Sequence, residues 1–78
     1  MAEELPLGNP ELLLELLHYA MPFGQYKGRR LRELPMPYLE WFARKGFPAG
    51  KLGVLLQTLY EIRLNGLDHL LDALPDNQ

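Results

Sequence analysis

The sequence lacks most of the residues on which small catalytic and metal sites depend. Its 78 residues contain no cysteine, no serine, a single threonine (Thr58) and two histidines. Without cysteine there are no disulfides, thiolate metal sites or thiol nucleophiles, and without serine there is no Ser-His-Asp triad. His18 and His69 have no carboxylate at metal-ligand spacing, so we interpret both as surface or packing residues. We therefore predict that the protein is not an enzyme, with no catalytic residue, no metal and no cofactor.

Long hydrophobic runs are also absent. The longest leucine run extends only from Leu12 to Leu14, far short of the roughly 20 apolar residues that a membrane-spanning helix needs. The first four residues, Met1 to Glu4, are acidic where a secretory signal is basic. The lack of cysteine agrees with a reducing compartment. We expect a cytoplasmic protein that has no membrane partner.

The spacing of apolar residues predicts three helices and a short terminal helical turn. Asn9 is placed to cap the first helix, and Gly46 is placed to end the second. The predicted elements are a helix from about Pro10 to Tyr19, a helix from about Pro35 to Lys45, a helix whose apolar face runs from Leu52 to Ile62 and which ends at Asn65-Gly66, and a turn from Leu67 to Leu74.

Between the first two helices, the stretch from Met21 to Leu31 predicts a small two-stranded β-hairpin. Two glycines four residues apart bracket a turn, and aromatic residues alternate with polar ones. Together these elements predict an α+β fold, mainly α, in one domain of residues 1–78 with frayed ends at 1–8 and 75–78. We expect Phe23, Trp41 and Phe42 in its core, whereas Tyr26 could lie in the core or on the surface.

Charge is unevenly distributed along the chain. The formal net charge is -2, yet residues 27–51 hold seven of the eight basic residues and only two acidic ones, a local charge of +5. Aromatic residues are interleaved with these cations, a composition typical of sites that bind single-stranded nucleic acid with cations on phosphates and rings on bases. The predicted nucleic-acid-binding residues are Tyr26, Lys27, Arg29, Arg30, Arg32, Arg44, Lys45 and Lys51.

Other interpretations of these features stay open. Charged residues also protect the edges of sheets, and an isoelectric point near 5.6 argues against strong nonspecific DNA affinity. A Gly46–Lys51 phosphate loop is excluded, because Leu52 stands where such loops need serine or threonine. The second hypothesis is a protein-interaction adaptor that uses the acidic, leucine-rich surface of the first helix or of the terminal turn, where the leucines exceed what a small core accommodates: Leu12, Leu14, Leu70, Leu71 and Leu74. In either case we expect a monomer or a weak homodimer.

Several ordered motifs are similar to those of a known family. They are Met21-Pro22-Phe23-Gly24-Gln25-Tyr26-Lys27-Gly28, Leu34-Pro35 with Tyr38-Leu39 and Trp41-Phe42, Lys45-Gly46-Phe47-Pro48, Gly50-Lys51-Leu52-Gly53, and the stretch from Glu61 to Leu67. Over about residues 19–72 the chain resembles the small bacterial domain described as putative quorum-sensing-regulated virulence factor. One residue departs from the family pattern, because Gln25 stands where lysine is expected more often. The resemblance implies a regulatory role in virulence.

The first motif, followed by Leu34-Pro35 and the Tyr38-Leu39-x-Trp41 pattern, is also similar to an accessory module that follows the nuclease domain of some bacterial DNA exonucleases. This similarity implies a nucleic-acid-associated role by analogy. The acidic metal ligands of such nuclease domains have no counterpart in this sequence, so hydrolysis does not follow from the resemblance.

Overall fold

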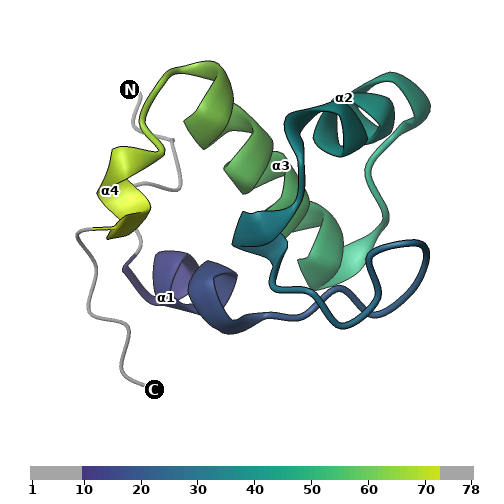
Figure 1. The fold of residues 1–78 in the computed structure, drawn as a ribbon, viewed down its shortest axis with the longest axis horizontal. Helices are drawn as coiled ribbons and strands as arrows, with labels where there is room; N and C mark the ends of the chain where they lie inside the picture. The colour runs from purple at the N-terminus through teal and green to yellow at the C-terminus, as the bar shows by residue number, and fades with distance from the viewer. Residues whose placement is uncertain (1–9, 73–78) are drawn as a thin grey trace.

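A computed structural model describes residues 10–72 of the protein, and these residues fold around one central helix (Figure 1). The elements in chain order are α1 (Pro10–His18), a 3-10 turn named η3 (Leu31–Glu33), α2 (Met36–Lys45), α3 (Gly50–Leu64) and α4 (His69–Asp72). Helix α3 packs against α1, η3 and α2. The predicted Asn9 cap, the frayed ends and the last two residues of the terminal turn lie outside the described residues.

The predicted helices are confirmed with small shifts of their ends. Helix α2 begins one residue later than predicted, with Pro35 in the N-cap position, and ends at Gly46, whose amide donates to the carbonyl oxygen of Phe42 at 2.6 Å. Gly46 has a φ of 112°, a backbone conformation that favours glycine. Helix α3 ends at Asn65 as predicted. The residues expected at the helix ends therefore predicted these boundaries to within one residue.

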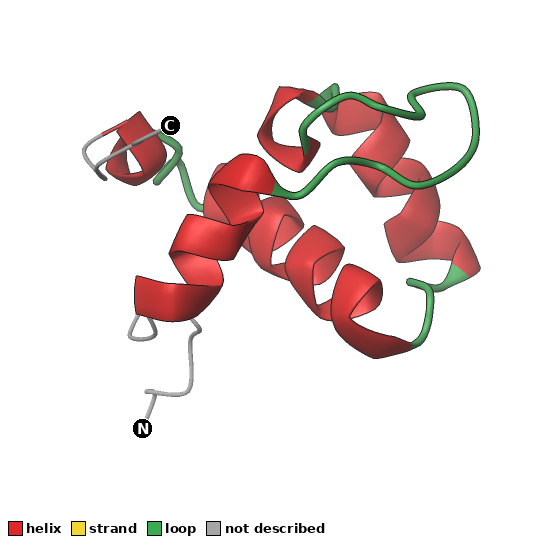
Figure 2. Cartoon of the chain, turned by 90° about the horizontal axis from the view of Figure 1, so that it is seen from below, coloured by secondary structure: helices red, strands yellow, loops and turns green. Residues whose placement is uncertain are grey.

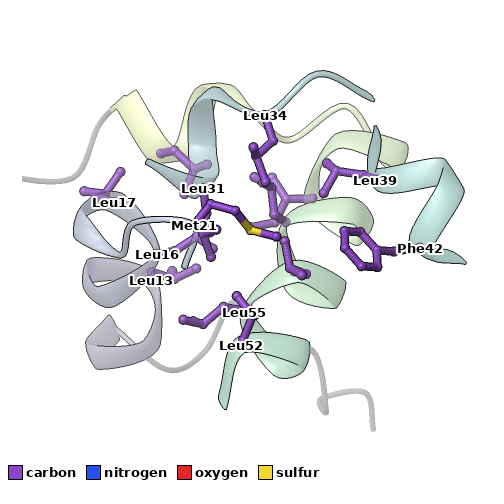
Figure 3. Packing of buried hydrophobic residues seen from close by; sticks show 14 residues of the cluster. Leu13, Leu16, Leu17, Met21, Leu31, Leu34, Leu39, Phe42, Leu52 and Leu55 are labelled. Atoms are coloured by element: carbon purple, nitrogen blue, oxygen red, sulfur yellow. The ribbon is translucent and has the colours of Figure 1, made fainter. Parts of the chain in front are cut away.

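All elements contribute leucine side chains to one hydrophobic cluster (Figure 3). Met21 reaches into its centre from the loop that follows α1 and is 1% exposed. The buried hydrophobic residues are Leu13, Leu16, Leu17, Met21, Leu31, Leu34, Leu39, Phe42, Leu52, Leu55, Leu56, Leu59, Ile62 and Leu71. Because α3 supplies five of these side chains, the other elements are held in place mainly by packing on it.

The predicted β-hairpin is wrong, and with it the α+β class: residues 10–72 form helices, turns and loops but no strand. The only pairing of strand type in this range is an isolated antiparallel bridge between Ala20 and Arg30. Next to it, the amide of Met21 donates to the carbonyl of Arg29 and the carbonyl of Met21 accepts from the amide of Gly28, both at 2.8 Å. Residues 21–30, hereafter the 21–30 loop, are thus joined by backbone hydrogen bonds where the two ends of the loop meet.

Local backbone conformation explains why the pairing does not extend. Pro22 has no amide to donate to a ladder, and Gly24 and Gly28 adopt φ angles of 81° and 90° that turn the chain away from an extended path. Tight turns follow, with the amide of Lys27 donating to Gly24 and that of Arg29 to Tyr26. The two glycines that suggested a hairpin turn therefore shape a wider loop.

A half-buried arginine ties η3 to the end of α3. The guanidinium of Arg63 donates from Nη1 to the carbonyl of Leu34 and from Nη2 to the carbonyl of Arg32, and its Nε lies 3.9 Å from Asp68 Oδ1. Burial lowers the pKa of Arg63, while Asp68 opposes that shift and Arg32 adds to it. Arginine still keeps its proton in proteins, so the side chain stays a charged donor to two carbonyls.

Replacing this arginine is expected to loosen the attachment of η3. The substitution Arg63→Met keeps the apolar stem but leaves two backbone carbonyls without their charged donor, which we expect to lower the free energy of unfolding by about 2 kcal/mol. Urea denaturation followed by circular dichroism measures this loss. Arg63→Lys cannot reproduce the planar two-nitrogen geometry and should recover only part of it. Full stability of Arg63→Met would contradict the structural role.

Candidate functional site

The 21–30 loop and the start of α2 enclose an open groove of about 720 Å³. Figure 2 shows this loop in green as the long excursion that follows α1. The groove is lined by Phe23, Gly24, Gln25, Tyr26, Pro35, Pro37, Tyr38, Trp41 and Phe42. None of these lining residues carries a formal charge, and most present rings, so the surface suits a flat apolar group.

Aromatic contacts connect the groove to the core. Tyr26 meets Tyr38 with ring centroids 4.7 Å apart, Tyr38 meets Phe42 at 5.1 Å, and Trp41 meets Phe42 at 5.2 Å, all edge to face. Phe42 also stacks on Phe47 at 6.2 Å. Edge-to-face pairs of this kind add to stability beyond the area they bury. Phe42 is buried, so it forms the floor of the groove and a part of the core at once.

The core prediction was confirmed for Phe42 and is wrong for Phe23 and Trp41, which are 46% and 45% exposed. Leu39 and Phe42 are one turn apart on the side of α2 that packs against α3. Trp41 is rotated about 100° from Phe42 around the helix axis, so its ring is turned toward the groove. Phe23 sits in the 21–30 loop and lines the groove. Tyr26, left open by the sequence, is half-buried against Tyr38.

Gly24 and Tyr38 approach each other closely where the loop crosses α2. A Cβ atom at Gly24 would lie 3.1 Å from the Tyr38 hydroxyl oxygen, and the φ of 81° at Gly24 already disfavours other residues. Burial raises the pKa of Tyr38, and nearby Tyr26 raises it further. The Tyr38 phenol therefore stays neutral at physiological pH and can donate a hydrogen bond within the groove.

The basic residues predicted as binding residues divide into two groups. Lys27, Arg29, Arg44 and Lys45 are exposed, and none forms an ion pair with another residue between 10 and 72. The first two extend from the 21–30 loop, and the other two lie three and four residues after Trp41, on the same side of α2 as that ring. We call these four residues the cationic rim.

The remaining cations are engaged elsewhere or lie outside this rim. Arg32 is paired with Asp72 at 2.5 Å, which joins η3 to α4, and Lys51 Nζ donates to Glu15 Oε2 at 2.8 Å. The hydrogen bond and the charge of Glu15 raise the pKa of Lys51. Arg30 is exposed, and its backbone forms the isolated bridge. The structure thus does not gather all eight predicted residues on one surface.

The leucines proposed for an adaptor surface are dispersed over the molecule. Leu12 and Leu14 are half-buried and pack against the core, and Leu71 is 1% exposed. Leu70 is 37% exposed, and Leu74 lies outside the described residues. These leucines therefore do not form one continuous exposed patch in the part of the chain that the structure describes.

Residues 10–72 contain neither a candidate membrane span nor a cluster of metal ligands. None of their helices is both long and apolar enough to cross a membrane. Nowhere in the same range do three or more histidine, aspartate or glutamate side chains gather as they would around a metal ion.

Comparison with known proteins places the chain in a family. The family described as putative quorum-sensing-regulated virulence factor matches residues 9–74. Two curated relatives, each named uncharacterized protein YpeB, come from Escherichia coli K12 and Escherichia coli O157:H7. Each is 55% identical over 65 residues, which cover 82% of this chain and 90% of the relative. No solved structure matches the fold significantly. On the extent of the family match, the chain belongs to the family of putative quorum-sensing-regulated virulence factors, as its motifs indicated.

Proposed function

We propose that this protein is a non-enzymatic binding module of the cytoplasm that contacts nucleic acid through the cationic rim. One observation carries the proposal: the two elements that line an open aromatic groove, the 21–30 loop and α2, also carry four exposed cations. Lysine and arginine side chains bind phosphates, and the release of counterions drives such binding. The resemblance of the loop motif to an accessory module of DNA exonucleases points in the same direction. The regulatory role in virulence follows only from the family name.

Electrostatics limits how strong this binding can be. The whole chain carries a formal charge of -2, and Glu40 lies next to Trp41 on the exposed side of α2. The attraction is therefore local, confined to distances near the Debye length of about 8 Å at physiological ionic strength. We expect modest affinity that depends strongly on salt, with a contact of a few phosphates.

The adaptor hypothesis has less support. It needs an exposed apolar surface of some size, whereas its leucines are divided between core, half-buried and exposed positions. A protein partner would become the better proposal if no nucleic acid binds at low salt.

Fluorescence anisotropy with labelled single-stranded DNA, single-stranded RNA and duplex DNA tests the proposal. We expect the double variant Lys27→Gln/Arg29→Gln to weaken binding roughly tenfold near physiological salt and to reduce the slope of log affinity against log salt by about 1 to 2, since each lost phosphate contact lowers that slope by nearly one. Thermal melting should be almost unchanged, because both side chains are exposed.

Single-charge variants provide a matched control. Lys27→Gln and Lys51→Gln change the net charge equally, but Lys51 is already paired with Glu15 and lies outside the cationic rim. We expect Lys27→Gln to weaken binding clearly more than Lys51→Gln. Equal effects would mean that only total charge matters, and no binding at tens of micromolar protein at low salt would refute the proposal.

A further inference from the structure

The groove contains two exposed rings whose exposure core packing does not explain. Phe23 and Trp41 are each nearly half exposed although they are among the largest apolar side chains of the protein. A small domain gains most stability by burying such rings. Here the loop and α2 instead hold them around a hollow of about 720 Å³, within the range of ligand pockets. The arrangement is that of a surface shaped to receive a group from outside.

Two properties of this site define the group that fits. The lining is apolar and aromatic, which favours a flat ring that can stack. Residues of the cationic rim are close to the lining along the chain, because Arg44 and Lys45 are one helical turn from Trp41 and Lys27 follows the lining residue Tyr26. Glu40 is the one acidic residue of α2. A ligand that complements both parts is aromatic and anionic, which describes a nucleotide unit and not a proline-rich peptide.

We propose that the groove is a stacking slot for an unpaired base of single-stranded nucleic acid, with the adjacent phosphates on the cationic rim. This inference rests on the proposed function and specifies its ligand. Trp41 and Phe23 present the stacking faces, and the neutral Tyr38 hydroxyl is available to a polar edge of the base. In a duplex the base faces are covered by their neighbours, so the slot discriminates against paired strands.

The chain provides its own probe for this contact, because Trp41 is the single tryptophan. Stacking of a base on the indole is expected to quench its fluorescence. Three ligands of equal length separate the contributions: oligo-deoxythymidine, its RNA counterpart oligo-uridine, and a strand of abasic sites that keeps the phosphates. We expect quenching with both base-bearing strands, none with the abasic strand, and roughly five- to hundredfold weaker binding of the abasic strand. The two base-bearing strands also rank DNA against RNA.

Variants on either side of the groove separate stacking from folding. Phe23→Ala retains the tryptophan probe and should weaken binding of oligo-deoxythymidine at least about fivefold, whereas Trp41→Phe should retain most of the affinity because it keeps an aromatic face. The matched control is Leu64→Ala, which shortens a side chain that is 60% exposed on α3, outside the groove. It should leave both affinity and quenching unchanged.

The possible results distinguish failure of this inference from failure of the proposed function. If the abasic strand binds as tightly as oligo-deoxythymidine, or if the strands bind without quenching, the base slot is refuted and the phosphate contact stands. If no strand binds, both are refuted. If a proline-rich peptide changes the fluorescence of Trp41 and no oligonucleotide does, the groove belongs to a peptide partner and the inference is overturned.

Discussion

Alanine in place of Gly53 is expected to lower the free energy of unfolding by about 3 kcal/mol or more. Gly53 is buried in α3, and a Cβ atom built there would lie 1.7 Å from the carbonyl oxygen of Pro48 and 2.8 Å from its carbonyl carbon. Real Cβ contacts are never this short, and the colliding group is backbone, which cannot rotate away as a side chain can. The segment that joins α2 to α3 would have to move, and Phe47 with it.

Helix propensity and the collision with Pro48 predict opposite effects of this substitution on stability. Alanine is favoured over glycine within helices by about 1 kcal/mol, so without the collision the variant would be more stable than the parent. Val54→Ala, one residue along at a side chain that is 50% exposed, is the matched control and should change stability by no more than about 0.5 kcal/mol. Urea denaturation followed by circular dichroism measures both variants. A Gly53→Ala protein as stable as the parent would show that α3 does not pass this close to Pro48.

The second large effect is expected for Phe42→Ala, at about 3 to 5 kcal/mol. Phe42 is 5% exposed and contacts the rings of Tyr38, Trp41 and Phe47, so its removal leaves a cavity between α2 and α3 and ends several aromatic contacts at once. Figure 3 shows the ring facing the centre of the cluster. A domain of this size has a total stability of roughly 4 to 12 kcal/mol, so the variant should lose a large part of it.

Trp41→Ala is the informative comparison for this variant. It removes a larger side chain, but one that is 45% exposed and meets the ring of Phe42 edge to face. We expect a loss of about 1 kcal/mol, the value of one aromatic pair. Thermal melting of both variants ranks them. If Trp41→Ala were the more damaging change, the tryptophan would belong to the core and the groove would not be open as described.

The sequence predicted the helices well because their signals are local. Apolar residues three and four apart define the buried side of α3, and residues such as Pro35 and Gly46 define ends through their own backbone restrictions. The 21–30 loop was misjudged for the opposite reason. Alternating aromatic and polar residues suggest strands, but whether glycines at 24 and 28 close a hairpin or widen a loop depends on φ angles that their identity leaves free.

The candidate site was predictable only in part. The sequence located the cations and the aromatic residues in one segment, and the structure brings Tyr26 of the 21–30 loop against Tyr38 near the start of α2. The sequence alone could not show that Arg32 is paired with Asp72 and Lys51 with Glu15, because those partners are 40 and 36 residues away along the chain. The groove itself was missed, since size and hydrophobicity placed Trp41 in the core. The signal that could have found it was the rotation of Trp41 away from Leu39 and Phe42.

The double role of Phe42 restricts how this protein can change during evolution. A single ring forms both the floor of the groove and a wall of the core, so a mutation that reshapes the floor also lowers stability. New ligand preferences can arise without that penalty only at exposed lining positions such as Phe23, Gln25 and Trp41. Divergence among relatives is therefore expected to concentrate on the outer side of the groove while its floor stays the same.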